Sequence, residues 1–113
     1  MYEYSCKLIR VIDGDTVDAL IDLGFDVWIK KRIRLYGIDA PETRTRDAWE
    51  KEQGLATKKR LEELLGAVNS EFILVSKGVG KYGRCLGELL IGEHGETHVN
   101  NLLISEGLAE KYE

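Results

Sequence analysis

A small, mainly β barrel with two helices is the fold class that this sequence predicts, and three observations support it. Apolar residues alternate with polar ones along the first third of the chain, as they do in strands with one inward face. One stretch of helical spacing follows, and after it come two short apolar runs separated by glycines. The length of 113 residues suits one domain and is too short for two, so residues 1–113 are treated as a single domain.

The first third of the chain is expected to form three antiparallel strands. Asp13-Gly14 separates the first run from the second, and Gly24-Phe25-Asp26 separates the second from the third. Both segments are typical hairpin connections, and Gly14 is expected to supply a positive φ to its turn. The inward residues of the three runs are Cys6, Leu8 and Val11, then Val17, Ala19, Ile21 and Leu23, then Val27, Ile29, Ile33 and Leu35.

An amphipathic helix is expected next, and Gly66 indicates its end. Charged residues from Glu50 onwards cover most positions outside its apolar face. That face has the i, i+3, i+4, i+7 spacing of a helix and consists of Leu61, Leu64, Leu65 and Val68.

The last part of the chain is expected to hold two strands and a short helix. The strands are predicted at residues 72–75 and 85–91, and the helix begins near Val99. Gly107 stops this helix, and Leu108 is placed for the hydrophobic contact of a Schellman-type cap. The element order matches a five-stranded Greek-key barrel of the OB type, with a helix between strands 3 and 4 and a short C-terminal helix. Closure of such a barrel removes its exposed sheet edges.

The composition excludes several classes of protein. A net charge of −4 argues against a purely electrostatic nucleic-acid binder, which shows excess positive charge. No apolar run approaches the roughly 18 residues of a membrane-spanning helix, so no membrane is expected as a partner. Cys6 and Cys85 are expected to be unbridged thiols. The N-terminal residues lack the features of a secretory signal, and a cytoplasmic location is therefore expected.

Two short acidic motifs could hold a metal ion. Asp13-Gly14-Asp15-Thr16 is either only a tight turn or a turn that offers the Asp15 carboxylate to a cation. Asp39-Ala40-Pro41-Glu42 follows the third strand, which carries Arg34 on its non-core face. This second motif either presents two carboxylates in a loop or starts a helix, with Asp39 as N-cap and Glu42 at N3.

A third motif, Lys81-Tyr82-Gly83-Arg84, ends a glycine-rich loop. Residues 78–83 formally satisfy the G-x-G-x-x-G pattern of dinucleotide binding. That pattern needs a helix directly after it to hold the pyrophosphate, whereas residues 84–92 are predicted as a strand, so nucleotide binding of this type is rejected. A P-loop is excluded as well, because Tyr82 stands where Ser or Thr would follow the lysine.

Taken together, the motifs favour a hydrolytic phosphodiesterase. Two like charges about 5 Å apart repel by about 3 kcal/mol at an effective dielectric constant near 20, so gathered carboxylates require a compensating cation. Oxygen ligands without nearby histidine or cysteine favour calcium or magnesium. Two arginines beside such an ion would bind a phosphate group. Further basic residues keep the surroundings of this site positive, namely Lys30, Lys31, Arg32, Arg44 and Arg46.

These motifs closely resemble the staphylococcal nuclease (thermonuclease) family. The resemblance runs from about Lys7 to Ala109, in matching order and with similar gaps. The matching segments are Ile12-Asp13-Gly14-Asp15-Thr16, Ile33-Arg34-Leu35, Asp39-Ala40-Pro41-Glu42-Thr43, Lys81-Tyr82-Gly83-Arg84, Val99-Asn100 and Gly107-Leu108-Ala109. The resemblance implies an OB-type barrel and calcium-dependent hydrolysis of single-stranded or locally melted DNA and RNA at the P–O5′ bond, with 3′-phosphate products and no obligate protein partner.

The resemblance also implies roles for individual residues. Asp15, Asp39 and the backbone carbonyl of Ala40 would bind Ca²⁺. The catalytic residues would be Arg34, Glu42 and Arg84, with Glu42 as general base and the two arginines stabilising charge on the phosphorus. Lys81, Tyr82 and Tyr112 would contact the substrate, Tyr112 lying one place from the family's usual tyrosine. The alternatives are a non-catalytic barrel that binds nucleic acid or a protein, and a purely structural calcium-binding barrel.

Overall fold

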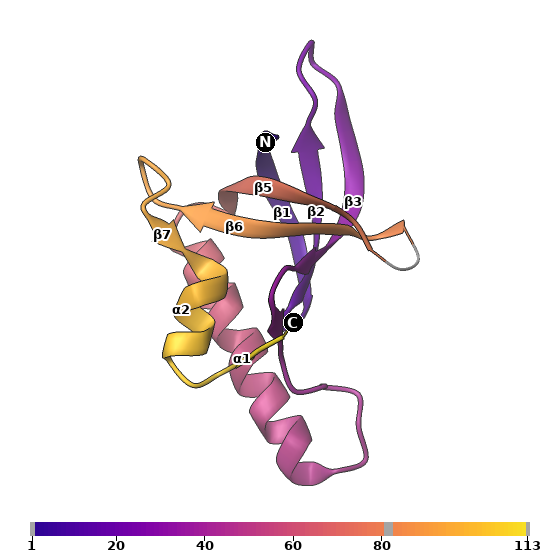
Figure 1. Ribbon diagram of the computed structural model, residues 1–113, viewed down its shortest axis with the longest axis vertical. Coiled ribbons are helices and arrows are strands. Elements are labelled where there is room, and N and C mark those ends of the chain that lie inside the picture. Colours follow the sequence, from indigo (N-terminus) through magenta and orange to yellow (C-terminus); the bar gives the residue numbers. More distant parts are fainter. Residues whose placement is uncertain (1, 81–82, 113) are drawn as a thin grey trace.

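The computed structural model describes residues 2–80 and 83–112, which form a β-barrel with one long and one short helix (Figure 1). None of the helices in these residues is long and apolar enough to cross a membrane. The strands are β1 Glu3–Asp13, β2 Thr16–Asp22, β3 Trp28–Leu35, β4 Ile38–Asp39, β5 Glu71–Val79, β6 Cys85–Ile91, β7 Thr97–His98 and β8 Glu110–Lys111. The helices are α1 Ala48–Gly66 and α2 Val99–Ser105.

Five strands close the barrel, and this confirms the predicted fold class. The strands β3, β2, β1, β5 and β6 are hydrogen-bonded neighbours in that order, each pair antiparallel. A parallel pairing between β3 and β6 then joins the two ends, with Ile33 opposite Cys85 and Leu35 opposite Gly87. The β2–β3 hairpin extends beyond the barrel, and α1 lies across its other end (Figure 1).

Most predicted element boundaries agree with the structure. The three N-terminal strands, the end of α1 at Gly66, β6 and α2 lie close to where the pattern placed them. Leu23 and Val27, however, were wrongly expected to face inward, since both lie just beyond the strand ends in the projecting hairpin and are exposed. The α2 helix ends in the predicted cap, since Gly107 has φ 74° and the Leu108 amide donates to the Leu103 carbonyl at 2.9 Å. Strand β5 is longer than predicted. Its last residues, from Ser76 onwards, were missed because they do not continue the apolar run and lie around a β-bulge.

The Asp13-Gly14 turn depends on close packing rather than on an unusual φ. Gly14 has no positive φ, so the reason expected for this glycine was wrong. A Cβ atom at this position would lie 2.3 Å from Cγ2 of Thr57 in α1. Thr57 is buried, and its hydroxyl donates to the Leu108 carbonyl at 2.6 Å. The turn that carries Asp15 is therefore seated on α1, and only glycine fits at the contact.

Helix α1 begins later than the acidic motif at 39–42. Asp47 is its N-cap, and the Asp47 carboxylate accepts hydrogen bonds from the amides of Trp49 at 3.0 Å and Glu50 at 3.3 Å. The alternative in which Asp39 capped a helix is therefore wrong. Residues 40–47 instead form a loop between β4 and α1.

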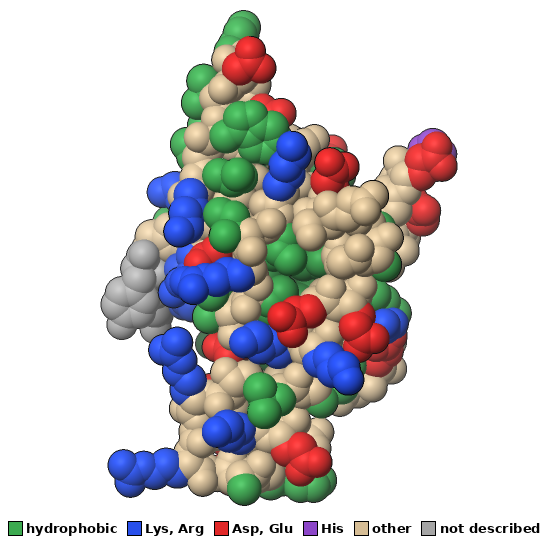
Figure 2. Space-filling model, turned by 180° about the vertical axis from the view of Figure 1, so that it is seen from behind, with side chains coloured by type: hydrophobic (Ala, Val, Ile, Leu, Met, Phe, Trp, Pro, Cys, Tyr) green, Lys and Arg blue, Asp and Glu red, His purple; other side chains and the backbone are tan. Residues whose placement is uncertain are grey.

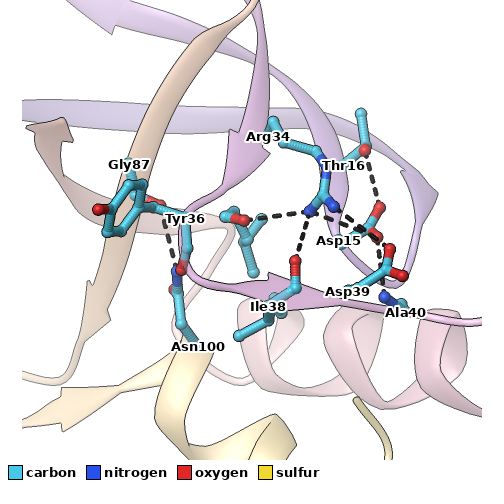
Figure 3. Close-up of polar contacts among 10 residues, drawn as sticks. Asp15, Thr16, Arg34, Tyr36, Ile38, Asp39, Ala40, Gly87 and Asn100 are labelled. Carbon is cyan, nitrogen blue, oxygen red and sulfur yellow. Dashed lines mark hydrogen bonds and ion pairs between the residues drawn. The ribbon is translucent and has the colours of Figure 1, made fainter. Parts of the chain in front are cut away.

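A buried asparagine connects α2 to the barrel. The Asn100 side chain, 1% exposed, accepts from the Leu89 amide at 3.0 Å and donates to the carbonyls of Tyr36 at 2.9 Å and Gly87 at 3.2 Å (Figure 3). These bonds fix the chain just after β3 against β6. Both cysteines are unbridged as predicted, and burial raises the pKa of the Cys6 thiol to about 12.

A buried carboxylate links two arginines on the outer face of β1, β2 and β3. Asp18, whose side chain is 5% exposed, accepts from Nε of Arg32 at 2.8 Å and from Nε of Arg10 at 3.1 Å. The hydrogen bond from Arg32, helped by Arg10, lowers the pKa of Asp18 against the opposing effect of burial.

This pKa shift predicts an acid-sensitive contribution to stability. Because the folded-state pKa lies below the unfolded value of about 3.9, the contribution is complete above that value and is lost as the pH falls through the folded-state pKa. Asp18→Asn should therefore lower the free energy of unfolding at pH 7, by about 1–2 kcal/mol because both arginines are partly solvated. Urea unfolding at pH 7 and pH 3 measures this. A deficit that does not shrink at low pH would contradict it, and Asp26→Asn in the exposed hairpin is the control.

Candidate active site

A small polar cavity lies where the start of β2, the end of β3 and the loop after β4 meet. Its volume is about 240 Å³. Every catalytic and metal-binding candidate from the sequence lines it, namely Asp15, Arg34, Asp39, Ala40, Glu42 and Arg84. Asp13, Thr16 and Pro41 complete the lining. The fold thus brings together residues from three separate motifs.

Asp15 is the most buried ionisable group of this cavity, 8% exposed. Its Oδ1 accepts from the Thr16 hydroxyl at 2.9 Å, and its Oδ2 accepts from the Ala40 amide at 2.9 Å. Its backbone carbonyl accepts from the Leu35 amide at 2.8 Å. These bonds hold the carboxylate in place and attach the loop after β4 to the turn before β2.

Arg34 occupies the centre of the site (Figure 3). Its guanidinium lies 3.4 Å from the Asp15 carboxylate and 3.3 Å from that of Asp39, so it bridges the two acids. Nη1 also donates to the carbonyls of Leu35 at 3.1 Å and Ile38 at 2.9 Å. With 17% of its side chain exposed, Arg34 is fixed in orientation while part of it still meets solvent.

Glu42 lies on the loop between β4 and α1, and α1 determines the path of that loop. The Glu42 amide donates to the Glu50 carboxylate at 3.4 Å. At Gly54 of α1 an added Cβ atom would lie 2.7 Å from the carbonyl oxygens of both Pro41 and Glu42. The loop backbone therefore rests directly on the helix. Within residues 2–80 and 83–112, no group donates a hydrogen bond to the Glu42 carboxylate, whose residue is exposed.

Arg84 enters the site from the chain just before β6, the strand that pairs with β3. The pairing sets Arg34 opposite Leu86, two residues after Arg84, and both arginines line the same cavity. Lys81 and Tyr82, the substrate contacts expected from the same motif, lie outside the described residues.

A second cavity adjoins the site and contains the third substrate candidate. Its volume is about 510 Å³, and Arg34, Asp39 and Arg84 line it together with Tyr112. Tyr112 reaches this position because β8 pairs with β4, and the Tyr112 amide donates to the Gly37 carbonyl at 2.9 Å. Tyr36, 48% exposed, lines the same cavity and was missed by the sequence analysis. Tyr36 follows Arg34 by two residues and therefore continues the outward-facing series of β3. This spacing is the signal that could have identified it.

The donor groups of the first cavity suit a hard divalent cation. In the described part of the chain no three His, Cys, Asp or Glu side chains are arranged to hold a metal ion, so the candidate set remains two carboxylates and a carbonyl. Asp15 is buried and hydrogen-bonded, whereas 58% of the Asp39 side chain is exposed and accessible to an ion. All donors are oxygens, and Ca²⁺ completes its six to eight ligands with water. The oxygen donors present therefore fit a hard divalent cation, a class that includes calcium.

Two comparisons with known proteins agree with this geometry. The family model described as "Staphylococcal nuclease homologue" matches residues 32–113. Protein ParB of Escherichia coli is 34% identical over 117 residues, in a match that covers 97% of this chain and 58% of ParB. The chain thus spans a little over half the length of that relative. The family match covers most of the chain and agrees with the closed barrel and its two helices, so the chain belongs to the staphylococcal nuclease homologue family and has its nuclease-like fold.

Proposed function

We propose that this protein is a calcium-dependent phosphodiesterase that hydrolyses single-stranded or locally melted DNA and RNA to 3′-phosphate products. The observation that supports this most strongly is the cavity of about 240 Å³ that Asp15, Asp39, Glu42, Arg34 and Arg84 line together. Oxygen donors for a cation, two guanidinium groups and an exposed carboxylate are the components that hydrolysis of a phosphodiester needs.

Glu42 acts as the general base. Its carboxylate is exposed beside the cavity and takes a proton from the attacking water, whose oxygen forms the new bond to phosphorus. The P–O5′ bond breaks, and the departing 5′-oxygen is protonated by solvent to give a 5′-hydroxyl. General base catalysis of this kind contributes roughly 10²- to 10⁴-fold to a rate.

Arg34 and Arg84 stabilise the negative charge that grows on the phosphate oxygens. Arg34 is already oriented by the backbone carbonyls of Leu35 and Ile38, which do not take part in the proposed cation site, so little reorganisation of its Nη1 is required when the charge develops. A planar guanidinium binds phosphate oxygens in a bidentate manner, which a lysine cannot do. Asp15, Asp39 and the Ala40 carbonyl would hold Ca²⁺, which when bound supplies further charge stabilisation and orients water.

The adjoining cavity holds the nucleoside next to the scissile phosphate. Tyr36 and Tyr112 supply aromatic surface there, and every base offers a π-face to such rings. Stacking of this type does not read the base sequence or the sugar, which accounts for activity on both DNA and RNA. Lys81 and Tyr82 are proposed to contribute to substrate binding on the family pattern.

The central prediction concerns cleavage itself. Single-stranded DNA and RNA incubated with the protein should be cleaved in calcium and left intact with chelator, and the fragments should carry 3′-phosphates. Glu42→Gln should lower kcat by about 10²- to 10⁴-fold because the water then lacks its base. Glu52→Gln on the exposed surface of α1 is the matched control. If the wild-type protein binds the strands without cutting them in calcium, the non-catalytic alternative is correct instead.

Calcium binding can be tested without activity. A ligand that binds only the folded protein stabilises it by RT ln(1 + [L]/Kd), so the Tm of the wild-type protein should rise as calcium is added. Asp15→Asn keeps the size of the side chain and an oxygen that can accept from the Ala40 amide, but it removes the charge. The rise in Tm should therefore be lost in this variant and kept in Asp26→Asn. An equal rise in Asp15→Asn and wild type would show that calcium binds elsewhere.

The position of Glu42 should depend on a glycine in α1. Gly54→Ala would place a Cβ atom against the Pro41 and Glu42 carbonyls and displace the loop. A shift near 1 Å in a catalytic group can cost about 10²-fold, so kcat should fall by about that factor with KM little changed. Gly66→Ala has no atom within 4 Å of the new Cβ and should keep its kcat. Melting curves of both variants separate this effect from unfolding, and a wild-type kcat in folded Gly54→Ala would contradict it.

A further inference from the structure

A groove with strongly positive lining opens into the candidate active site. Its volume is about 700 Å³. It shares Asp13, Thr16 and Arg84 with the cavity of the active site, so the two are continuous. The lining of this basic groove also includes Lys30, Lys31, Arg32 and Arg44, together with Ile12 and Gly83. Figure 2 shows Lys and Arg side chains gathered along this side of the molecule, which is on the left in that view.

The cations of the groove differ in how far they are neutralised. Arg32 is paired with the buried Asp18 carboxylate, which offsets its charge. In contrast, none of the carboxylates in residues 2–80 and 83–112 forms an ion pair with Lys30, Lys31 or Arg44. All three of these residues are exposed. Unpaired cations concentrated in one groove of a chain with net charge −4 indicate a polyanionic ligand.

The opposite side of the site carries the reverse charge. A cavity of about 560 Å³ adjoins Asp39, Ala40 and Glu42 on the side of α1. Its further acidic lining residues are Asp47, Glu50 and Glu110. A polyanionic strand is repelled from this side and attracted to the other. The charge distribution therefore sets the side on which the strand continues away from the scissile phosphate.

We infer that the basic groove binds the backbone phosphates of a single nucleic-acid strand beyond the nucleotide at the cleavage site. This inference rests on the proposed function and extends it, since it makes a long strand, and not a dinucleotide, the substrate for which the site is built. Lys30, Lys31 and Arg44 make the phosphate contacts. The groove adds affinity without base recognition, because contacts to phosphates carry no sequence information.

The experiment compares two substrates of different length. The variant combines Lys30→Gln, Lys31→Gln and Arg44→Gln, and the control combines Lys51→Gln, Lys58→Gln and Lys59→Gln on α1, which changes the net charge equally. Kinetics are measured with a single-stranded 20-mer and with a dinucleotide that contains one phosphodiester bond. Binding of the 20-mer is measured by fluorescence anisotropy in calcium-free buffer from about 0.05 to 0.5 M salt.

The groove variant should bind the 20-mer more weakly. For single strands log K changes with log salt by about −0.7 for each phosphate neutralised, so loss of three contacts should reduce the magnitude of this slope by about 2. At about 0.1 M salt this corresponds to an affinity loss of about tenfold to 100-fold, with a matching rise in KM for the 20-mer. The effect on the dinucleotide, which is too short to enter the groove, should be much smaller, and the α1 control should follow the wild type.

Three results with the nucleic-acid substrates would overturn the inference. The first is an equal loss on both substrates, the second is an equal loss in the α1 control, and the third is wild-type binding by the groove variant. Vesicles containing phosphatidylserine provide a further arm. A loss of vesicle binding with unchanged binding of the 20-mer would assign the groove to a lipid surface and also overturn it. If the wild type cleaves neither substrate, the proposed catalytic function fails, while the anisotropy data still decide whether the groove binds the strand.

Discussion

The parallel pairing of β3 with β6 is the constraint on which the site depends. β3 carries Arg34, and β6 follows directly after Arg84, so the hydrogen bonds that close the barrel also bring the two guanidinium groups to one cavity. The same closure explains why Asn100 is buried beside the β3–β6 pairing. There its side chain accepts a hydrogen bond from the Leu89 amide and donates to the carbonyls of Tyr36 and Gly87. Without closure the two arginines would lie on opposite edges of an open sheet. The candidate active site thus depends on closure of the β-barrel.

Local patterns in the sequence were sufficient for most of the fold. Alternation located β2 and β3 because their apolar side chains share one face of each strand, and glycine marked the ends of α1 and α2. The two-residue strands β4 and β8 could not be predicted, since they form only when the loop after β3 meets the C-terminal segment. For the same reason the need for Gly14 was misjudged. Its neighbour Thr57 lies in a helix far along the chain, and no local pattern contains that contact.

The candidate residues of the site were predicted more completely than their interactions. The sequence suggested that gathered carboxylates need a cation, and in the structure Arg34 itself lies between Asp15 and Asp39. In the proposed function, Arg34 and a divalent ion would therefore compete for the same two acids. Asp15 has further hydrogen bonds from Thr16 and Ala40, whereas Asp39 is largely exposed, so Asp39 is the acid that can more readily exchange Arg34 for an ion. On this proposal Arg34 would then have more of its donors free for phosphate, and cation binding would be coupled to substrate binding.

The net charge of this protein does not show how unevenly its charges are distributed around the candidate site. The overall charge of −4 excludes a purely electrostatic nucleic-acid binder, yet the acidic residues beside α1 and the unpaired cations of the basic groove lie on opposite sides of one site. If the basic groove binds a strand as proposed, a charge distribution of this kind would favour the basic side of the site over the acidic side for the neighbouring phosphates. An acidic nuclease-like domain of this size can therefore hold a polyanion at its site without being a basic protein.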